Sequence, residues 1–331
     1  MKAAMRDRYG PPSVVEIREL TTPAPANDEV LVRVRAASLN RSDLDGLYPR
    51  WQFTRLFSGL RRPKVKRLGL DMAGIVEAVG PAVTQFSPGD RVFADLYAFG
   101  QGAFAEYVCV PERALGHMPE GLSFEAAAAI PHSAVLALQG LRLRDGRTIA
   151  AGDRVLIEGA SGNVGPFAVQ IAKAMGAVVT GVCRTDKVDF VRSLGADHVI
   201  DYTAVDYTTT GERYEWIVAV EAHHSLLRSF RALAPGGAYV AHGASTAWLL
   251  SSILITPAIS WATDRWAGLL MWWKPFDPPD VERIAALIAT GQVRPIIDRT
   301  FPLDQIVEAL TYVDEGRASG KVVISMSGSD T

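Results

Sequence analysis

The sequence predicts an α/β protein in two parts, a compact β-rich part and a doubly wound parallel sheet. Apolar runs and helix-length patterns alternate from residue 153 to residue 242, which is typical of a parallel sheet with right-handed crossovers. Residues 1–120 instead hold short strands with no helix-length pattern between them. A chain of 331 residues also exceeds the length that one hydrophobic core usually serves, so we expect two domains.

The β-rich part is predicted from alternating apolar and polar residues, with glycine and proline turns such as Pro88-Gly89-Asp90 between the runs. An alanine-rich helical region follows, with Ser123 as its N-cap. The elements expected before residue 150 are strands at Glu29–Ala37, Gly74–Val79, Arg91–Ala94 and Phe104–Val110, and a helical region at Leu122–Leu143.

The stretch 153–187 predicts one strand–helix–strand unit with a glycine-rich turn. An apolar strand at Val155–Ile157 leads into the turn, a helix runs to Met175, and a second strand follows at Val178–Cys183. Free N–H groups at the helix N-terminus attract a pyrophosphate, and glycines let the backbone approach it. The turn has the pattern A-x-G-x-x-G, with Ala160 at the usual first glycine. We therefore predict a dinucleotide site at Ser161, Gly162, Asn163, Val164 and Gly165, against the alternative of a turn that binds nothing.

The residues after the second strand predict NADPH rather than NADH as the cofactor. An enzyme that prefers NAD usually places an acid there, roughly 20 residues after the turn, to bind the ribose 2′-hydroxyl. This chain has Arg184 first, and Asp186 only after it. A guanidinium can grip a 2′-phosphate with two hydrogen bonds, and Lys187 adds a second positive charge. The alternative is that Arg184 merely starts the next helix in solvent.

The alternation continues after residue 187, where Pro235-Gly236-Gly237 and Gly291 each end a helix. Gly243, Ala244 and Ser245 follow a strand end, where a doubly wound sheet binds ligands, so we predict that they contact the cofactor. The expected elements are helices at Val188–Leu194, Ser225–Leu233, Pro278–Ala289 and Leu303–Val313, and strands at His198–Ile200, Trp216–Val220, Ala238–His242 and Lys321–Ser325.

Composition and charge exclude several classes of protein. A net charge of −2 and the lack of a patterned basic helix give no case for nucleic-acid binding. Two cysteines are too few for a disulfide framework or a four-cysteine zinc lobe. The first ten residues carry charges where a signal peptide has its apolar core, so we expect a cytoplasmic protein.

Two segments do not fit this scheme. Arg50–Arg67 carries seven basic residues and no acid, interleaved with aromatic and leucine residues, and Ala247–Phe276 is rich in tryptophan and leucine. Ser251-Ser252, Pro257 and Asp264-Arg265 interrupt the apolar runs, so we expect no membrane-spanning segment there. We interpret both segments as a pocket lid or a subunit contact, with a weak peripheral membrane contact as the alternative.

The motifs taken together resemble the medium-chain dehydrogenase/reductase superfamily, over essentially the whole chain. They are Tyr9-Gly10, the glycine-containing run Leu68–Gly80, Pro88–Val92, Gly102–Tyr107 and Gly320–Val323. The resemblance implies a GroES-like catalytic domain at residues 1–122 and 292–331 and a Rossmann domain at residues 123–291. It adds Tyr202, as the tyrosine near the adenosine phosphate, and Lys321 to the predicted cofactor-binding residues.

Zinc-dependent members of this superfamily hold the metal with a Cys, a Gly-His-Glu motif and a further Cys or Asp. The matching positions here have Asn40 and Gly69-Leu70-Asp71, and no cysteine lies near Pro131-His132-Ser133. Two oxygen ligands alone are poorly suited to zinc. The chain therefore resembles the zinc-free quinone oxidoreductase and enone reductase branch, and we predict neither catalytic nor structural zinc.

The resemblance implies hydride transfer from NADPH to a small hydrophobic acceptor, a C=C conjugated to a carbonyl or a quinone, which needs no metal ion. Such chemistry needs positioning and one or two donors aimed at the acceptor oxygen. The candidate donors are the Asn40 amide, the Tyr48 phenol and the His132 imidazole. Each has a structural alternative, since Asn40 can bind loop backbone, Tyr48 can line a pocket and His132 can be a buried core histidine.

Two other functions stay open at this point. One is reduction of a larger acyl or polyketide substrate, and the other is a non-catalytic NADPH-binding scaffold. The resemblance also implies a homodimer that forms through the Rossmann domain.

Overall fold

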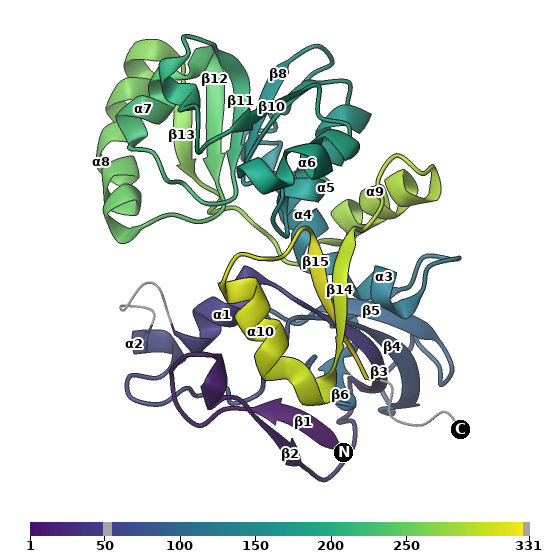
Figure 1. Cartoon of the computed structure of the whole chain (residues 1–331). Coiled ribbons are helices and arrows are strands. Elements are labelled where there is room, and N and C mark those ends of the chain that lie inside the picture. Colours follow the sequence, from purple (N-terminus) through teal and green to yellow (C-terminus); the bar gives the residue numbers. More distant parts are fainter. Residues whose placement is uncertain (49–54, 327–331) are drawn as a thin grey trace. The chain divides into compact units, whose positions relative to one another are not determined.

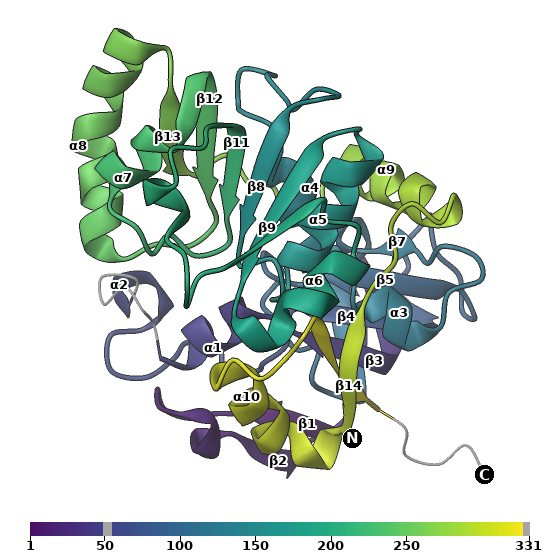
Figure 2. The ribbon, with the colours of Figure 1, turned by 45° about the horizontal axis from the view of Figure 1, so that its top comes forward.

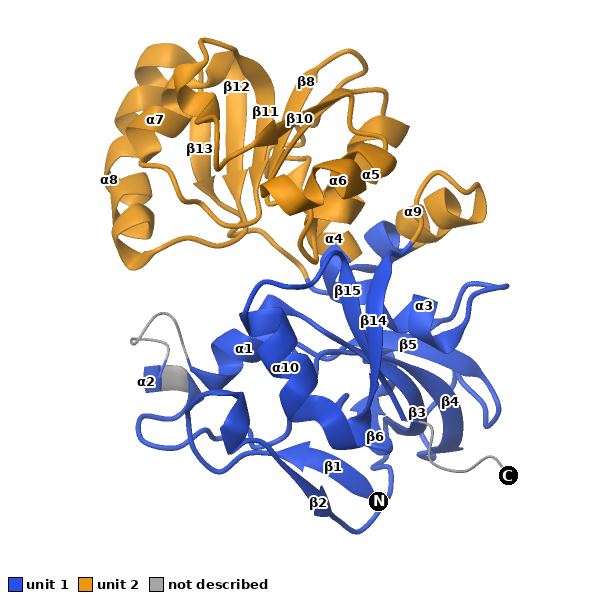
Figure 3. Cartoon of the chain, in the orientation of Figure 1, with its two compact units in different colours: residues 1–133, 275–281, 295–331 blue, residues 134–274, 282–294 orange. Residues whose placement is uncertain are grey.

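The computed structural model describes residues 1–48 and 55–326, and the chain forms two compact units (Figure 3). Unit 1 contains residues 1–133, 275–281 and 295–331, and unit 2 contains residues 134–274 and 282–294. The expected fold class is confirmed, because one unit is built on a mostly antiparallel sheet and the other on a parallel sheet.

Unit 1 is organised around β3 (Glu29–Leu39), whose length lets it pair with three strands at once. Strand β4 pairs along one side, while β6 and β15 share the other side, β6 at residues 29–33 and β15 at residues 36–39. Val30, Val32 and Val34 are at most 2% exposed, as their alternation with polar residues predicts. The other strands are β1 (Lys2–Met5), β2 (Glu16–Glu19), β4 (Asp71–Val79), β5 (Arg91–Asp95), β6 (Tyr107–Pro111), β7 (Gly116–His117), β14 (Ile297–Pro302) and β15 (Lys321–Ser325).

The helices of unit 1 lie between and around these strands, and α10 lies beside α1 (Figure 1). Hydrogen bonding explains where the unit ends, because Ser38 Oγ donates to the carbonyl oxygen of Ala128 in α3 at 2.8 Å. The boundary between units therefore follows residue 133, not residue 122 as expected from the sequence. The helices are α1 (Arg41–Leu47), α2 (Arg55–Ser58), α3 (Phe124–Ala128) and α10 (Ile306–Asp314).

Unit 2 is a six-stranded parallel sheet in the order β10-β9-β8-β11-β12-β13. The order reverses between β8 and β11, and the carboxyl ends of those two strands form the switch point at which doubly wound sheets bind ligands. The strands are β8 (Arg154–Glu158), β9 (Val178–Cys183), β10 (His198–Asp201), β11 (Tyr214–Ala219), β12 (Leu233–Ala241) and β13 (Trp266–Leu269). The helices are α4 (Pro131–Gly140), which starts in unit 1, α5 (Gly165–Ala174), α6 (Val188–Ser193), α7 (Leu226–Arg231), α8 (Thr246–Thr263) and α9 (Pro278–Ala289), which also starts in unit 1.

Helix α7 is shorter than the sequence predicts, and the expected stop signal lies inside β12. The strand begins at Leu233, pairs with Tyr214, and then shifts register before Ala238 pairs with Trp216. Pro235, Gly236 and Gly237 fill this irregular stretch, because a proline without an N–H and two unhindered glycines are tolerated where a ladder is interrupted. The Pro-Gly-Gly sequence thus marks a bulge in a strand.

The Trp-rich segment forms α8 and β13, and the serines and proline that interrupt its apolar runs do not interrupt the helix. Ser251 and Ser252 donate their hydroxyls to carbonyl oxygens of the preceding turn, which leaves them compatible with a helix. By length and composition alone, α8 is long enough and apolar enough to cross a membrane, and it is the one such helix in the described ranges. Figures 1 and 2 show α8 alongside β13 at the edge of the sheet.

Helix α8 buries one tryptophan and two polar residues and exposes most of its aliphatic side chains. Trp248, Ser252 and Thr256 are buried, and the Thr256 hydroxyl donates to the carbonyl oxygen of Ala267 in β13 at 2.6 Å. The opposite stripe is exposed to 56% at Leu250, 61% at Ile253, 76% at Leu254 and 90% at Trp261. This inversion of the usual amphipathic pattern explains why periodicity did not predict the helix.

We expect Leu156→Ala in β8 to lower the free energy of unfolding of unit 2 by about 2–5 kcal/mol, because Leu156 is fully buried in the central strand. Leu254→Ala is the matched control, because its exposed side chain leaves no cavity, and its effect should stay within about 0.5 kcal/mol. Urea unfolding followed by circular dichroism measures both, and equal losses in the two variants would contradict the assigned packing.

Candidate active site

Unit 1 holds a cluster of polar side chains, here called the polar cluster, in which every member is at most 3% exposed. Strand register brings its members together, because Asp71 pairs with Ser38 of β3 on one side and with Asp95 of β5 on the other. Lys321 starts β15, whose next residue pairs with Leu39. The members of the polar cluster are Asn40, Asp43, Asp71, Asp95, His132, Ser133 and Lys321.

Lys321 directs its ammonium group at three partners inside the polar cluster. Its Nζ donates to Asn40 Oδ1 at 2.7 Å, to Asp71 Oδ2 at 3.1 Å and to Ser133 Oγ at 3.2 Å. Asn40 Nδ2 in turn donates to Asp71 Oδ2 at 2.9 Å. Two residues predicted from the sequence, Asn40 and Lys321, thus lie together and hold each other in place.

His132 lies at the start of α4 and has a partner on each ring nitrogen. Its Nδ1 is 2.8 Å from Asp95 Oδ2, its Nε2 is 3.0 Å from Ser42 Oγ, and its backbone N–H donates to Asp71 Oδ1 at 3.0 Å. Burial by itself lowers the pKa of His132, but the Asp95 and Asp71 carboxylates together raise it, and the pKa ends above its usual value. His132 can therefore carry a proton although it is buried.

The carboxyl groups of the polar cluster respond to burial in the opposite direction. Burial raises the pKa of Asp43 to about 7, although its carboxylate accepts a hydrogen bond from the Asn40 N–H at 2.8 Å. Burial also raises the pKa of Asp71, against the opposing effect of the Lys321 ammonium. Near neutral pH the polar cluster can thus exchange a proton at Asp43.

Tyr48, the third predicted donor, ends α1 on the side of α10. Burial raises the pKa of its phenol, and the Asp314 carboxylate of α10 raises it further. The structure therefore brings Asn40 and His132 together in the polar cluster, whereas Tyr48 lies beside Asp314.

The glycine-rich turn of unit 2 follows β8 at the switch point of the sheet and leads into α5. A Cβ on Gly165 would lie 2.2 Å from the carbonyl oxygen of Gly159, so only glycine lets the helix start this close to the turn. A Cβ on Gly162 would have a single protein neighbour within 4 Å, at 3.6 Å, which leaves open space over the turn. Val164 is the N-cap of α5 and makes no side-chain capping bond, so an anion can approach the first-turn N–H groups.

The residues predicted to read the ribose lie at the end of β9 and in the turn after β10. Arg184 makes a bidentate ion pair with Asp186, at 2.6 and 2.8 Å, and this pair holds the pKa of Asp186 at about 2. Lys187 is mostly buried, with 14% of its side chain exposed, and Tyr202 is 57% exposed. In this structure the Arg184 guanidinium is thus paired with the carboxylate of Asp186.

The strand-end residues Gly243, Ala244 and Ser245 connect β12 to α8. The Gly243 carbonyl oxygen accepts from the Ala222 N–H at 2.8 Å, and Ala244 forms an isolated parallel bridge with Ala222. Ser245 caps α8, its hydroxyl accepting from the Trp248 N–H at 3.2 Å. These residues lie two strands away from β8, next to the carboxyl end of β11.

Sequence reasoning missed three residues with prominent environments. Ser42 and Asp95 flank His132. The only signals for them in the sequence are that Ser42 lies two residues after Asn40 and that Asp95 follows a predicted strand. Glu158 ends β8, where Tyr207 and Tyr239 donate their hydroxyls to its Oε2 at 3.2 and 3.1 Å. Burial raises the pKa of Glu158 to about 7.

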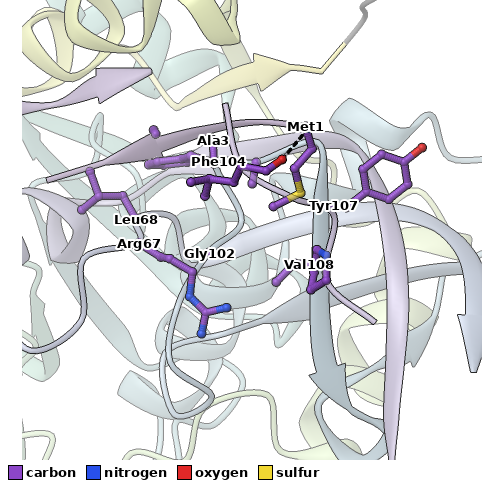
Figure 4. Close-up of a pocket in the computed structure, with 12 residues that line it drawn as sticks. Met1, Ala3, Arg67, Leu68, Gly102, Phe104, Tyr107 and Val108 are labelled. Atoms are coloured by element: carbon purple, nitrogen blue, oxygen red, sulfur yellow. Dashed lines mark hydrogen bonds between the residues drawn. The ribbon is translucent and has the colours of Figure 1, made fainter. Parts of the chain in front are cut away.

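A pocket in unit 1 is lined by none of these residues (Figure 4). Its volume is about 30 Å³, which admits only a few water molecules and no organic substrate. Its walls are mostly apolar and include Met1, Ala3, Leu68, Phe104 and Val108.

Comparison with known proteins gives matches over the whole chain. Residues 26–120 match a family described as alcohol dehydrogenase GroES-like domain, and residues 194–324 match one described as zinc-binding dehydrogenase. The chain is 30% identical to a mouse (Mus musculus) protein named NAD(P)H oxidoreductase RTN4IP1, mitochondrial, over 98% of this chain and 89% of the relative. It is 29% identical to an Arabidopsis thaliana protein named NADPH-dependent alkenal/one oxidoreductase, chloroplastic, over 98% of this chain and 79% of the relative.

Solved structures agree with these sequence relatives. The quinone oxidoreductase from Coxiella burnetii matches with a TM-score of 0.85 and 27% identity, over 99% of each chain. The names of the two sequence relatives refer to mitochondria and chloroplasts, and give no support to the cytoplasmic location expected from the sequence.

We expect Lys321→Met to lower the free energy of unfolding by about 3–5 kcal/mol, because it leaves the buried Asp71 carboxylate without its cation. The double variant Lys321→Met/Asp71→Asn should recover part of that loss, because it removes both charges of the pair. Lys2→Met is the matched control, since the Lys2–Asp304 pair is 46% and 64% exposed and should contribute at most about 1 kcal/mol. Urea unfolding at pH 7 measures these three variants, the single variant Asp71→Asn and the wild type, and a loss in the double variant equal to the sum of the two single losses would argue against the pair.

Proposed function

The chain belongs to the medium-chain dehydrogenase/reductase superfamily, with relatives named quinone and enone oxidoreductases, and on this premise we propose that it is an NADPH-dependent reductase. Its acceptor is a C=C bond conjugated to a carbonyl, or a quinone, and the reaction uses no metal ion. The coarser statement, that it is an oxidoreductase with a nicotinamide cofactor, already follows from membership of the family. The observation that carries the proposal is the glycine-rich turn at the switch point, followed by Arg184.

The residues of unit 2 fit the cofactor. The open space over Gly162 and the uncapped start of α5 suit a pyrophosphate, which Ser161, Asn163, Val164 and Gly165 would border. NADPH supplies the hydride when it is bound. Arg184 and Lys187 would bind its 2′-phosphate, with Tyr202 beside the adenosine and Gly243, Ala244 and Ser245 near the nicotinamide half.

A 2′-phosphate has to compete with Asp186 for Arg184. Both side chains are about half exposed, and an exposed ion pair contributes little to stability, so a doubly charged phosphate can displace the carboxylate. Asp186 is also the acid that would accept a hydrogen bond from the 2′-hydroxyl of NADH. We propose that the preference between NADPH and NADH depends on whether Arg184 binds the 2′-phosphate more strongly than Asp186 binds the 2′-hydroxyl.

The environment of Lys321 supports a reaction without zinc. Its ammonium lies between Asn40 Oδ1 and Asp71 Oδ2, so the two oxygens at the positions of zinc ligands in the family already share a cation. The family resemblance assigned Lys321 to the cofactor, but its burial and three partners favour a positioning role for Asn40 and Asp71. An enone or quinone accepts hydride without a Lewis acid, whereas an alcohol oxidation would need one.

Among the three proposed donors, the structure favours His132. The Asn40 amide already donates to Asp71, and Tyr48 lies beside Asp314, whereas the Asp95 carboxylate raises the pKa of His132, which favours its donating form. We also keep the homodimer as a proposal, since β13 is an edge strand in the described sheet and the exposed stripe of α8 adjoins it. Arg50, Trp51 and Phe53 of the basic segment lie outside the described residues, and membrane contact stays a prediction.

To test the activity, purified protein is mixed with NADPH or NADH and offered 9,10-phenanthrenequinone, a benzoquinone, an alkyl vinyl ketone, a 2-alkenal and a simple ketone. We expect NADPH oxidation with a quinone or an enone and none with the simple ketone. Arg184→Ala should raise KM for NADPH by about tenfold or more, as loss of a charged hydrogen bond does. Asp186→Ala is the matched variant and should lower that KM. Tight NADPH binding without turnover of any acceptor would support the scaffold alternative instead.

For the metal, we expect prolonged dialysis against a chelator to leave kcat unchanged, with less than about 0.1 zinc per chain by elemental analysis at full activity. Asn40 and Asp71 bonded to an ammonium offer no vacant pair of oxygens to a zinc ion. Activity that is lost on chelation and restored by added zinc would show that the zinc-free assignment is wrong.

A further inference from the structure

We propose that residues 55–67 of unit 1, here called the basic loop, form a docking surface for an anionic lipid bilayer. Docking of this kind is independent of the proposed reductase function, because it needs neither cofactor nor acceptor. The sequence left a pocket lid, a subunit contact and a membrane contact open for this part of the chain. The charges and the exposed side chains of the basic loop favour the membrane contact.

The basic loop concentrates positive charge in a chain that is slightly acidic as a whole. It contains six of the 34 lysine and arginine residues and none of the 36 aspartate and glutamate residues. Lys66 is paired with Asp7 at 2.8 Å. Arg61, Arg62 and Lys64 are exposed, and none of these three forms an ion pair with any residue in the ranges 1–48 and 55–326. Their charges are therefore available to the phosphates of a lipid surface.

Aliphatic side chains lie exposed among these basic residues. Leu56 is 67% exposed, Leu60 is 65% exposed and Val65 is 38% exposed, although leucine and valine are usually buried in folded proteins. Aliphatic side chains bind at the boundary between lipid headgroups and acyl chains, where neighbouring cations also meet the headgroup phosphates. The basic loop thus combines the two kinds of side chain that an anionic bilayer attracts.

The backbone of the basic loop is fixed to the rest of unit 1. The Tyr9 hydroxyl donates to the carbonyl oxygen of Gly59 at 2.8 Å, and the Arg6 N–H donates to the carbonyl oxygen of Lys66 at 3.0 Å. Gly59 has a φ of +116°, and a Cβ at this position would clash with the carbonyl oxygen of Arg62, so the turn requires glycine. Because the backbone is already ordered, docking costs little conformational entropy.

Two other kinds of partner fit the basic loop less well. A second copy of the chain that met this loop with its own would bring like charges together, which is unfavourable. Proteins that bind single-stranded nucleic acid stack aromatic rings on the bases. Leu56, Leu60 and Val65 offer no ring for such stacking, but they can enter the apolar part of a bilayer.

Co-sedimentation with vesicles tests the docking of the whole chain without cofactor. The vesicles contain phosphatidylcholine alone, or phosphatidylcholine with about one-third phosphatidylserine. We expect binding to the anionic vesicles only, and weaker binding when the salt concentration rises from about 0.1 M to about 0.5 M. Arg61→Gln/Arg62→Gln should lower the partition coefficient by about 25-fold, because each charge near the surface contributes about fivefold. Arg144→Gln/Arg231→Gln removes two exposed charges of unit 2 and should bind like the wild type.

The aliphatic contribution is tested separately in the same assay. Leu56→Ser/Leu60→Ser should lower the partition coefficient by about tenfold, because two apolar side chains are lost from the contact. Leu227→Ser/Leu254→Ser, which changes two exposed leucines of α7 and α8, is the matched control and should leave the partition coefficient unchanged. A larger loss in this control than in the basic-loop variant would assign vesicle binding to unit 2 and overturn the proposal.

An environment-sensitive fluorophore gives a readout that does not depend on removing a contact. It is attached to Leu60→Cys in a Cys109→Ser background, in which the remaining Cys183 is buried. We expect its emission to shift to the blue when anionic vesicles are added. The same fluorophore at Leu227→Cys should show no shift, and equal shifts at the two positions would contradict docking through the basic loop.

Three further results would overturn the proposal. They are no binding of the wild type to anionic vesicles, equal binding to neutral and anionic vesicles, and binding of single-stranded RNA in place of vesicles. None of them bears on the proposed reductase, because reduction is measured with NADPH and a soluble acceptor. A wild type that binds anionic vesicles but reduces no acceptor would leave the docking surface intact and overturn only the reductase.

Discussion

The buried ammonium of Lys321 is the contact on which unit 1 depends. It joins the last strand of the chain to Asn40 at the end of β3, 281 residues earlier, and to Asp71 at the start of β4. A cation at 1% exposure is strongly unfavourable unless its donors are all satisfied, and here each of the three meets an acceptor. The return of the C-terminus to the first part of the chain is therefore fixed by charge as well as by β15 pairing.

The same charge sets the properties of its neighbours. Three carboxyl groups, Asp43, Asp71 and Asp95, share a small buried volume with two cationic groups, Lys321 and His132. If all were ionised, one negative charge would be in excess, and the raised pKa of Asp43 lets a proton remove it. Burial thus lets Asp43, whose carboxyl group would be fully ionised at neutral pH in water, exchange a proton near neutral pH.

Unit 2 depends on a different constraint, the close approach of a helix to the strand that precedes it. Gly165 is required because the Gly159 carbonyl oxygen lies where a Cβ would be, and this approach directs the first turn of α5 at the switch point. Helix α8 shows the opposite case, in which a few hydrogen bonds and Trp248 anchor the helix while its aliphatic side chains face outward. Close backbone contacts thus constrain the glycine-rich turn before α5, whereas α8 at the edge of the sheet is held by few contacts.

The sequence by itself determined the two-part α/β class, the parallel sheet and the bounds of elements such as β9, β15 and α9, because periodicity and turn residues act locally. It did not reveal β13 or α8, whose outward-facing leucines have no amphipathic period. The partners of His132 were equally hidden, since Ser42, Asp95 and His132 are brought together only by strand register and the start of α4. Residue types along the chain indicate which chemistry is available, but distances between residues far apart in sequence depend on the packed sheet, and only the tertiary structure decided them.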